Sequence, residues 1–262
     1  MTNPIPLLSH HLDEPSVFTP EALLDAVRAA RNLARGPVPP ICILEFDGDL
    51  TDWLISTGVV KPWNSWACFH TAMHAFEVDG TPCGIVPRTI GGPYAALIAE
   101  QLKSSGAQVV LGLTSAGRVA ASVPVPSLVV AISAIRDEGT SYHYLAAGRP
   151  ALADAKLADS LRRSLKNLGI PVLTGVVWTT DAPYRETGQQ LAEYSRQSVL
   201  AVEMQAASLF AFGIARDLPV GMVAHVTNAV DHEQDPFDKG SHEFGHQLFE
   251  AMCRAAKSHL GT

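Results

Sequence analysis

Short apolar runs alternate with longer amphipathic stretches along this chain from about residue 41 to its end. Apolar runs bounded by turn residues predict buried strands, and apolar residues three and four apart predict helices. The expected strands cover residues 41–46, 108–113, 128–132, 172–178, 199–202 and 220–227, and the expected helices residues 20–33, 94–104, 154–168, 188–196, 205–216 and 240–258. This alternation predicts an α/β fold with three layers, α/β/α, around a central, largely parallel mixed sheet.

Residues 1–40 are expected to form an N-terminal extension and one helix. Thr19 is suited to cap that helix and Pro20 to occupy its first turn. Turns are expected at Asp47-Gly48-Asp49 and at Asp79-Gly80, the latter joining residues 66–78 and 81–87 in a hairpin. With no internal repeat or interdomain linker in the sequence, we expect a single domain over residues 1–262.

The composition narrows the class of protein. The chain is 47% hydrophobic and 17% charged, which is ample for a folded core. Its net charge of −7 argues against nucleic acid as a partner, because a phosphate backbone requires a basic surface. No apolar run of about 18 residues predicts a membrane span, and residues 1–20 lack the pattern of a signal peptide. The four cysteines show no CxxC spacing, so we expect a reduced, cytoplasmic protein without a zinc knuckle or disulfide framework.

Polar motifs follow several expected strands, where ligands collect in a parallel sheet. Gly91 and Gly92 precede a helix, so backbone N–H groups there could receive an anion or a sugar hydroxyl; a plain helix-start turn is the alternative. Thr114 and Ser115 follow a buried strand and are expected in a loop whose hydroxyls and amides hold an oxyanion.

Glu203 lies beside Met204 and Gln205 in the otherwise apolar segment 200–211. A buried carboxylate costs several kcal/mol unless it is paired. Glu203 is therefore either a structural anchor bound to backbone amides or a group that binds a ligand.

Together these stretches resemble the nucleoside phosphorylase family, especially its uridine phosphorylase branch. The resemblance rests on residues 90–93, 113–117, 135–144, 179–187, 200–211 and 224–228, in family order. It implies cleavage of the N-glycosidic bond of a nucleoside with phosphate as the attacking group. The implied partners are a nucleoside and inorganic phosphate, the latter as co-substrate with no other cofactor, and the implied assembly is a homo-oligomer.

The resemblance also implies a role for each site residue. Glu203, Met204 and Gln205 would bind ribose; Thr114, Ser115, Gly91 and Gly92 phosphate; Asp181, Tyr184 and Glu186 the base; and Arg185 and Asn228 would act on the base as catalytic residues. An arginine can donate to a carbonyl oxygen of the leaving base, where negative charge develops. Asn228 stands where the purine-cleaving branch has an Asp and the uridine branch an Asn, which favours a pyrimidine-like or oxo-base.

The phosphate motifs depart from the family pattern. Gly112 stands where related phosphorylases have an arginine, Thr114 replaces a glycine, and the early glycine-rich loop has no match near residues 47–49. The loss of an arginine–phosphate contact forfeits a few kcal/mol. Candidates to compensate are Arg88, Arg118, Arg136 and an arginine from a neighbouring subunit. Hydrolysis, with water as the attacking group, is therefore kept as an alternative.

The sugar and base motifs depart as well. Gln205 replaces a glutamate that grips the sugar, and Pro183 replaces a stacking phenylalanine, for which Tyr184 or Trp178 would have to substitute. A non-catalytic, nucleoside-binding homologue is the third alternative.

Residues 242–246 spell H-E-x-x-H, which on a helix can bind zinc. Phe249 and Met252 occupy the spacings at which extended versions of that motif carry glycine and histidine. We therefore expect no metal and interpret the motif as the polar face of the C-terminal helix.

Overall fold

The computed structural model describes residues 5–229 and 239–261, so the first four residues of the expected N-terminal extension lie outside the described residues. Its strands are β1 (Ile41–Glu45), β2 (Lys61–Pro62), β3 (His74–Val78), β4 (Thr81–Pro87), β5 (Val109–Arg118), β6 (Ser127–Asp137), β7 (Ala151–Leu152), β8 (Val172–Thr180), β9 (Ala201–Glu203) and β10 (Val220–Ala229). Its helices are α1 (Pro20–Arg31), α2 (Asp49–Ser56), α3 (Gly92–Ser104), α4 (Ala155–Leu165), α5 (Gly188–Arg196), α6 (Ala206–Arg216) and α7 (His242–Leu260), with 3-10 turns η1 (Pro6–Leu8), η2 (Thr140–His143) and η3 (Pro183–Arg185).

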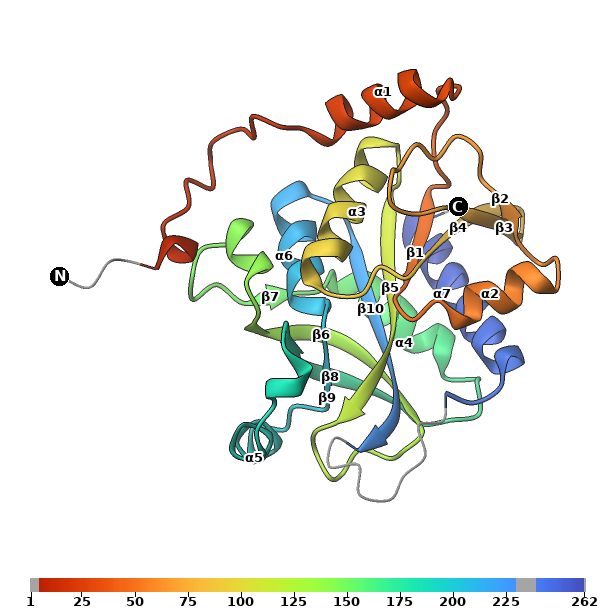
Figure 1. Ribbon diagram of the computed structural model, residues 1–262. Coiled ribbons are helices and arrows are strands. Elements are labelled where there is room, and N and C mark those ends of the chain that lie inside the picture. The colour runs from red at the N-terminus through yellow and green to blue at the C-terminus, as the bar shows by residue number, and fades with distance from the viewer. Residues whose placement is uncertain (1–4, 230–238, 262) are drawn as a thin grey trace.

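One mixed sheet lies at the centre, with α3 and α6 on one face and α2, α4 and α7 on the other (Figure 1). Its strand order is β10-β6-β8-β9-β5-β1-β4-β3-β2, and β7 pairs with β6. The predicted three-layer α/β fold is confirmed. No helix in the described part of the chain is long and apolar enough to cross a membrane.

The sheet also closes on itself around β5. Strand β5 pairs with β1 over its first half and with β9 at its end, while β10 runs parallel to it along nearly its whole length. Because β10 also pairs with β6, the strands β5, β10, β6, β8 and β9 form a ring. The ring brings the ends of β5, β9 and β10 together.

Residues of β1 show why the central strands are continuous apolar runs. The side chains of Cys42 and Leu44 lie on the face of the sheet that α3 and α6 cover. Those of Ile41 and Ile43 lie on the opposite face. Because both faces are covered by helices, every position of the strand is buried.

Helix starts agree well with the sequence. The Thr19 hydroxyl accepts the Ala22 N–H at the start of α1, as predicted, and Pro20 follows it. Residues 188–196 are helical within the predicted bounds, because Thr187 and Gln190 form a capping box.

Two local predictions are wrong, and one helix was not predicted. Thr114 and Ser115 lie in β5 rather than in a loop, because pairing with β10 continues the strand to Arg118. Residues 66–73 are not strand, so the hairpin around Asp79-Gly80 begins at His74. Helix α2 has no counterpart among the expected helices; at its start the Glu45 carboxylate accepts the Gly48 N–H at 2.7 Å.

Candidate active site

A cavity of about 370 Å³ lies at or just beyond the carboxyl ends of β1, β5, β8, β9 and β10. Ligands of α/β proteins often bind beyond the carboxyl ends of strands. The predicted site residues that line the cavity are Thr114, Ser115, Tyr184, Glu186, Glu203, Met204, Gln205 and Asn228. The structure therefore gathers in one place the residues predicted for the sugar, residues predicted for phosphate and base, and one of the two predicted to be catalytic.

Glu203 closes the amino-terminal end of α6. One carboxylate oxygen accepts the N–H groups of Gln205 at 2.6 Å and Ala206 at 2.8 Å. The Thr179 hydroxyl donates to the other oxygen and accepts the Ala207 N–H at 2.9 Å. The first turn of a helix leaves N–H groups without partners, and these contacts satisfy them. Both oxygens are engaged, as expected of the structural anchor among the two alternatives.

Burial raises the pKa of Glu203 to about 7, and the nearby carboxylate of Glu138 adds to the shift. The hydroxyl and the two amides oppose it by stabilising the charged form. Glu203 thus changes protonation in the neutral pH range.

Met204 and Gln205, the two residues after Glu203, line the cavity. The Gln205 side chain is only 1% exposed, and its carbonyl oxygen accepts the Met204 N–H at 3.2 Å. Met204 is half-buried, and both residues line the cavity. The tight turn between β9 and α6 therefore places an amide and a thioether at the same edge.

Asn228 sits near the end of β10, beside an irregularity in the pairing of β10 with β5 between Val226 and Asn228. Such irregularities redirect side chains and are frequent next to active sites. The Asn228 carboxamide accepts from the Thr227 hydroxyl and donates to the Ala229 carbonyl, both at 3.1 Å. Its position is thus fixed by the strand end.

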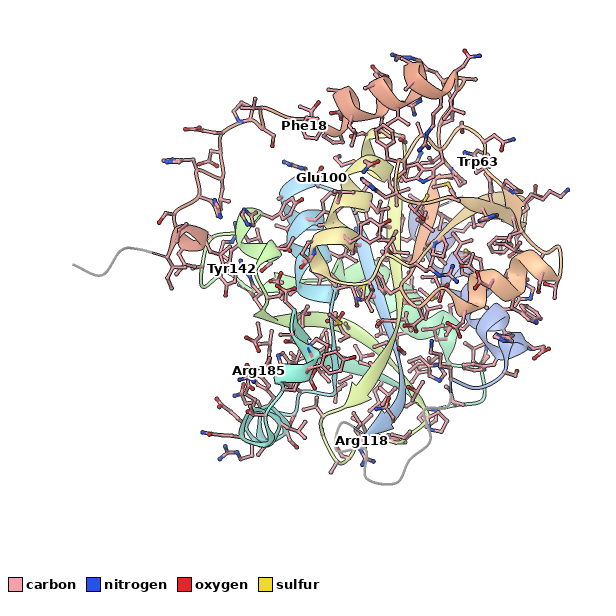
Figure 2. The ribbon with its side chains drawn as sticks, viewed as in Figure 1. Phe18, Trp63, Glu100, Arg118, Tyr142 and Arg185 are labelled. Atoms are coloured by element: carbon pink, nitrogen blue, oxygen red, sulfur yellow. The ribbon has the colours of Figure 1, made fainter. Side chains whose placement is uncertain are left out.

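Residues predicted for the base lie at the rim or beside it. Tyr184 is fully exposed, and half-buried Glu186 has its pKa raised by burial. Arg185 and Asp181 line a neighbouring cavity that shares Glu186 with the first. Asp181 accepts the Gly139 N–H at 2.8 Å. Figure 2 shows Arg185 at η3, close to α5.

Trp178 is not available to stack on a base, contrary to one sequence expectation. Its side chain is fully buried, its indole N–H donates to Asp137 at 3.0 Å, and its ring lies 4.7 Å from that of Tyr194. Trp178 is part of the core beneath α5.

Gly91 and Gly92 do not line the cavity, although their neighbour Ile90 does. Helix α3 begins at Gly92, and a Cβ added there would lie 2.2 Å from the Ser208 hydroxyl oxygen on α6. Glycine is required at this position for the close approach of the two helices.

The cavity contains one acid that the sequence presented only as a turn residue. Asp47, just after β1, accepts the Ser115 hydroxyl at 3.2 Å and the Ser115 N–H at 3.3 Å. The rule that placed the other residues at strand ends applies to Asp47 too, so this signal was present. Lys239, from a distant part of the chain, forms an ion pair with Asp47 at 3.0 Å. No sequence pattern indicates this contact.

No arginine or lysine is among the described residues that line the cavity. A Cβ on Gly112 would lie 2.1 Å from the Met222 sulfur and 3.0 Å from a ring carbon of Phe46, so the space for a longer side chain is filled. Arg136 donates to three backbone carbonyls and to a serine hydroxyl, and Arg88 pairs with Asp52. Arg118 lies at the end of β5 near the edge of the molecule (Figure 2).

The H-E-x-x-H residues have other neighbours in the structure. His242 stacks on Trp53 with ring centres 5.7 Å apart, and His246 lies 3.6 Å from Glu250. Within residues 5–229 and 239–261, the group with metal-ligand spacing consists instead of Glu45, Asp47 and Asp49.

Fold and cavity together describe an α/β protein with a cavity where the ends of β5, β9 and β10 meet. The profile of the Phosphorylase superfamily matches residues 40–260, so the chain belongs to that superfamily. This agrees with the resemblance drawn from the motifs.

The sequence identity to individual relatives is modest, 26–30%. The chain is 30% identical over 148 residues to a guanosine phosphorylase of Halorubrum lacusprofundi, covering 56% of this chain and 61% of the relative. It is 29% identical over 174 residues to a uridine phosphorylase of Thermococcus kodakarensis, covering 61% of this chain and 63% of the relative. To a uridine phosphorylase of Escherichia coli it is 26% identical over 164 residues, covering 57% and 65%. The chain thus spans less than two thirds of the length of each of these relatives.

Proposed function

We propose that this protein is a pentosyltransferase that cleaves the N-glycosidic bond of a nucleoside by phosphorolysis. In this reaction the bond between C1′ and the base nitrogen breaks, and a phosphate oxygen forms the new bond to C1′. The base leaves with the electron pair and takes up the proton that hydrogen phosphate loses as it forms the ester. Membership of the superfamily and the names of the relatives, guanosine and uridine phosphorylase, support this assignment.

The single observation that carries the proposal is the shared cavity. A sugar, a base and an attacking group must meet within one site, and this cavity is lined by Ser115, Gln205 and Asn228 from three different strand ends. Positioning reactants in this way converts a bimolecular encounter into a near-unimolecular step.

Each side of the cavity receives a role in the proposal. Met204 and Gln205 hold the pentose, while Glu203 holds the turn that carries them. Thr114 and Ser115 hold phosphate, and Gly91 and Gly92, which follow the cavity-lining Ile90 at the start of α3, are further phosphate-binding positions in the proposal.

The base is addressed from two sides. Asn228 hydrogen-bonds it at the end of β10, and Arg185, with Asp181, acts from the adjoining cavity, next to Tyr184 and Glu186. Guanine and uracil, the bases in the relatives' names, both carry carbonyl oxygens that can accept such hydrogen bonds. We therefore propose an oxo-base as the leaving group.

Product analysis tests the proposal. The full-length protein is incubated with uridine or guanosine, with and without inorganic phosphate, and the pentose product is identified by mass spectrometry. Pentose 1-phosphate formed only with phosphate is the expected result. No cleavage of either nucleoside, with binding detected by calorimetry, would instead identify a nucleoside-binding homologue.

Hydrolysis is the second candidate function, and one contact favours it. The Asp47 carboxylate occupies the N–H and hydroxyl of Ser115, which are the donors predicted for phosphate. Free pentose released at the same rate with and without phosphate would establish water as the attacking group.

Three broader features are also proposals. We propose one domain over residues 1–262, assembly into a homo-oligomer, and a cytoplasmic location. The four cysteines are all free thiols and buried, which suits a reducing compartment.

A further inference from the structure

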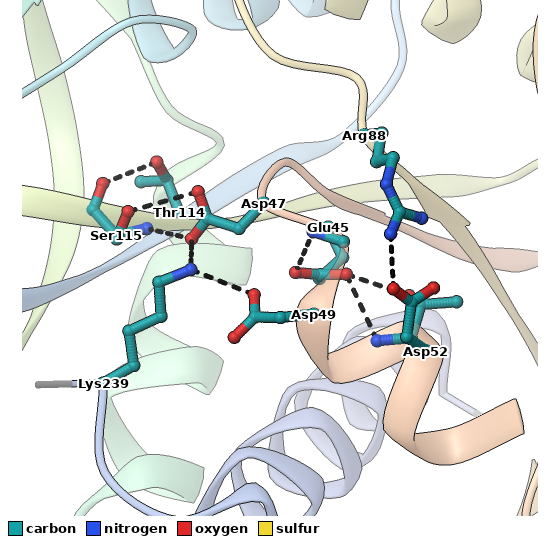
Figure 3. A network of polar contacts seen from close by, with 10 residues as sticks. Glu45, Asp47, Asp49, Asp52, Arg88, Thr114, Ser115 and Lys239 are labelled. Carbon is teal, nitrogen blue, oxygen red and sulfur yellow. Dashed lines mark hydrogen bonds and ion pairs between the residues drawn. The ribbon is translucent and has the colours of Figure 1, made fainter. Parts of the chain in front are cut away.

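Three donors converge on the carboxylate of Asp47, a residue between β1 and α2 (Figure 3). The Ser115 hydroxyl donates to one oxygen at 3.2 Å, and the Ser115 N–H donates to the other at 3.3 Å. The Lys239 ammonium lies 3.0 Å from that second oxygen. A backbone amide, a hydroxyl and an ammonium are together the donors that proteins use to bind an oxyanion.

These donors face the candidate site. Asp47 and Ser115 line the main cavity, and a smaller adjoining cavity is lined by Asp47, Ser115 and Lys239. Asp47 is half-buried, and its side chain is 24% exposed, so an ion entering the cavity can reach it. The carboxylate therefore stands where an attacking anion would be bound.

Two further carboxylates lie beside Asp47. Lys239 also pairs with Asp49 at 3.0 Å, and Glu45 lies in the same cluster. Both Glu45 oxygens are held by the start of α2, through the N–H groups of Gly48 and Thr51 and the Thr51 hydroxyl. Glu45 thus occupies the amides of Gly48 and Thr51, and among the described residues Lys239 brings a positive charge to Asp47.

Binding of a second anion to these donors costs free energy while Asp47 stays in place. Like charges a few ångströms apart at a half-buried site repel each other, and each donor has a limited number of protons to offer. An anion must displace the carboxylate or bind against its repulsion.

We propose that Asp47 is an internal occupant of the phosphate subsite, that phosphate binds by displacing it from Ser115, and that Lys239 supplies the cation of that subsite. The inference rests on the proposed function for the identity of the anion, inorganic phosphate. In this proposal Asp47 weakens phosphate binding and Lys239 strengthens it.

Two substitutions separate these roles. Asp47→Asn retains the shape of the side chain and removes the competing charge, so phosphate should bind about tenfold more tightly. Lys239→Gln removes the cation, so phosphate should bind about tenfold more weakly. Asp52→Asn is the matched control, because Asp52 belongs to the same helix start, pairs with Arg88 and does not line the cavity.

The experiment is calorimetric titration of inorganic phosphate into the full-length protein at constant ionic strength, without nucleoside. Circular dichroism and thermal melting check that each variant folds, and Asp47→Ala provides a second variant of the same expected sign. The expected order of affinity is Asp47→Asn above the original protein, with Asp52→Asn equal to the original and Lys239→Gln below it.

Two results would overturn the inference: phosphate binding by Asp47→Asn no tighter than by the original protein, or unchanged binding by Lys239→Gln. Nucleoside cleavage is measured in parallel on the same samples. The expected order of phosphate binding without any cleavage would leave the inference standing and refute the proposed function. Cleavage of nucleosides with phosphate binding unmoved by either substitution would refute the inference alone.

Discussion

Glu203→Gln tests how burial controls the carboxylate at the start of α6. Glutamine has the shape of the protonated acid, and its carbonyl oxygen can accept the N–H groups of Gln205 and Ala206 as the carboxylate does. Its NH₂ group would face the Thr179 hydroxyl oxygen. The substitution therefore keeps the contacts and removes the ionisation.

The magnitude follows from the pKa. Burial raises the pKa of Glu203 from an ordinary 4.5 to about 7 in the folded protein. Between these values the folded chain keeps a proton that the unfolded chain has released, so raising the pH through this window lowers stability. At about 1.4 kcal/mol per pH unit the full loss is about 3 kcal/mol, complete above the folded pKa.

The assay is urea unfolding of both proteins at a series of pH values from about 4.5 to about 8. The free energy of unfolding of the original protein, minus that of Glu203→Gln, should fall by about 3 kcal/mol across this range. Glu45, whose pKa burial also raises to about 7, is present in both proteins, so its contribution cancels in the difference. A difference that stays constant or increases with pH would show that the contacts with the ionised form outweigh burial, which would refute the reasoning.

Two further predictions concern the cavity wall and the core behind it. Gly112→Ala should lower the free energy of unfolding by about 1–3 kcal/mol, because the new Cβ would meet the Met222 sulfur, and Met222→Ala in the same chain should recover part of that loss; additive effects in urea unfolding would contradict this. Gln205→Glu should raise kcat/KM for nucleoside cleavage about tenfold or more, because a carboxylate stabilises the cationic sugar of the transition state. An unchanged kcat/KM would mean that residue 205 does not face the sugar.

Part of the site follows from a local rule. Ser115, Gln205 and Asn228 each lie at or just beyond the end of an apolar run, where ligands of α/β proteins collect. Strand β9 runs antiparallel to β5, so these strand ends meet through the closure of the sheet and not through parallel alignment. The motifs that carry the family resemblance are local too, which is why the superfamily was recognised from the sequence. The roles of the individual site residues remain predictions.

Contacts between distant segments could not be predicted from the sequence in this way. The periodicity ended a strand at residue 113, but β10 pairs with β5 as far as Arg118 and places Ser115 on a strand. Helix α2 is instead a local feature: Glu45 accepts the N–H groups of Gly48 and Thr51, three and six residues further along the chain. The extension of β5 depends on a distant strand and has no signature within its own window of sequence.

The amino-acid sequence by itself determined the order of the main strands and helices and the layers they form, because hydrophobic periodicity and capping act over a few residues. Only the tertiary structure decided the closure of the sheet around β5 and the meeting of Asp47, Ser115 and Lys239. Those contacts join segments far apart in the chain. Their geometry depends on the simultaneous packing of all the layers, which no local pattern of residues encodes.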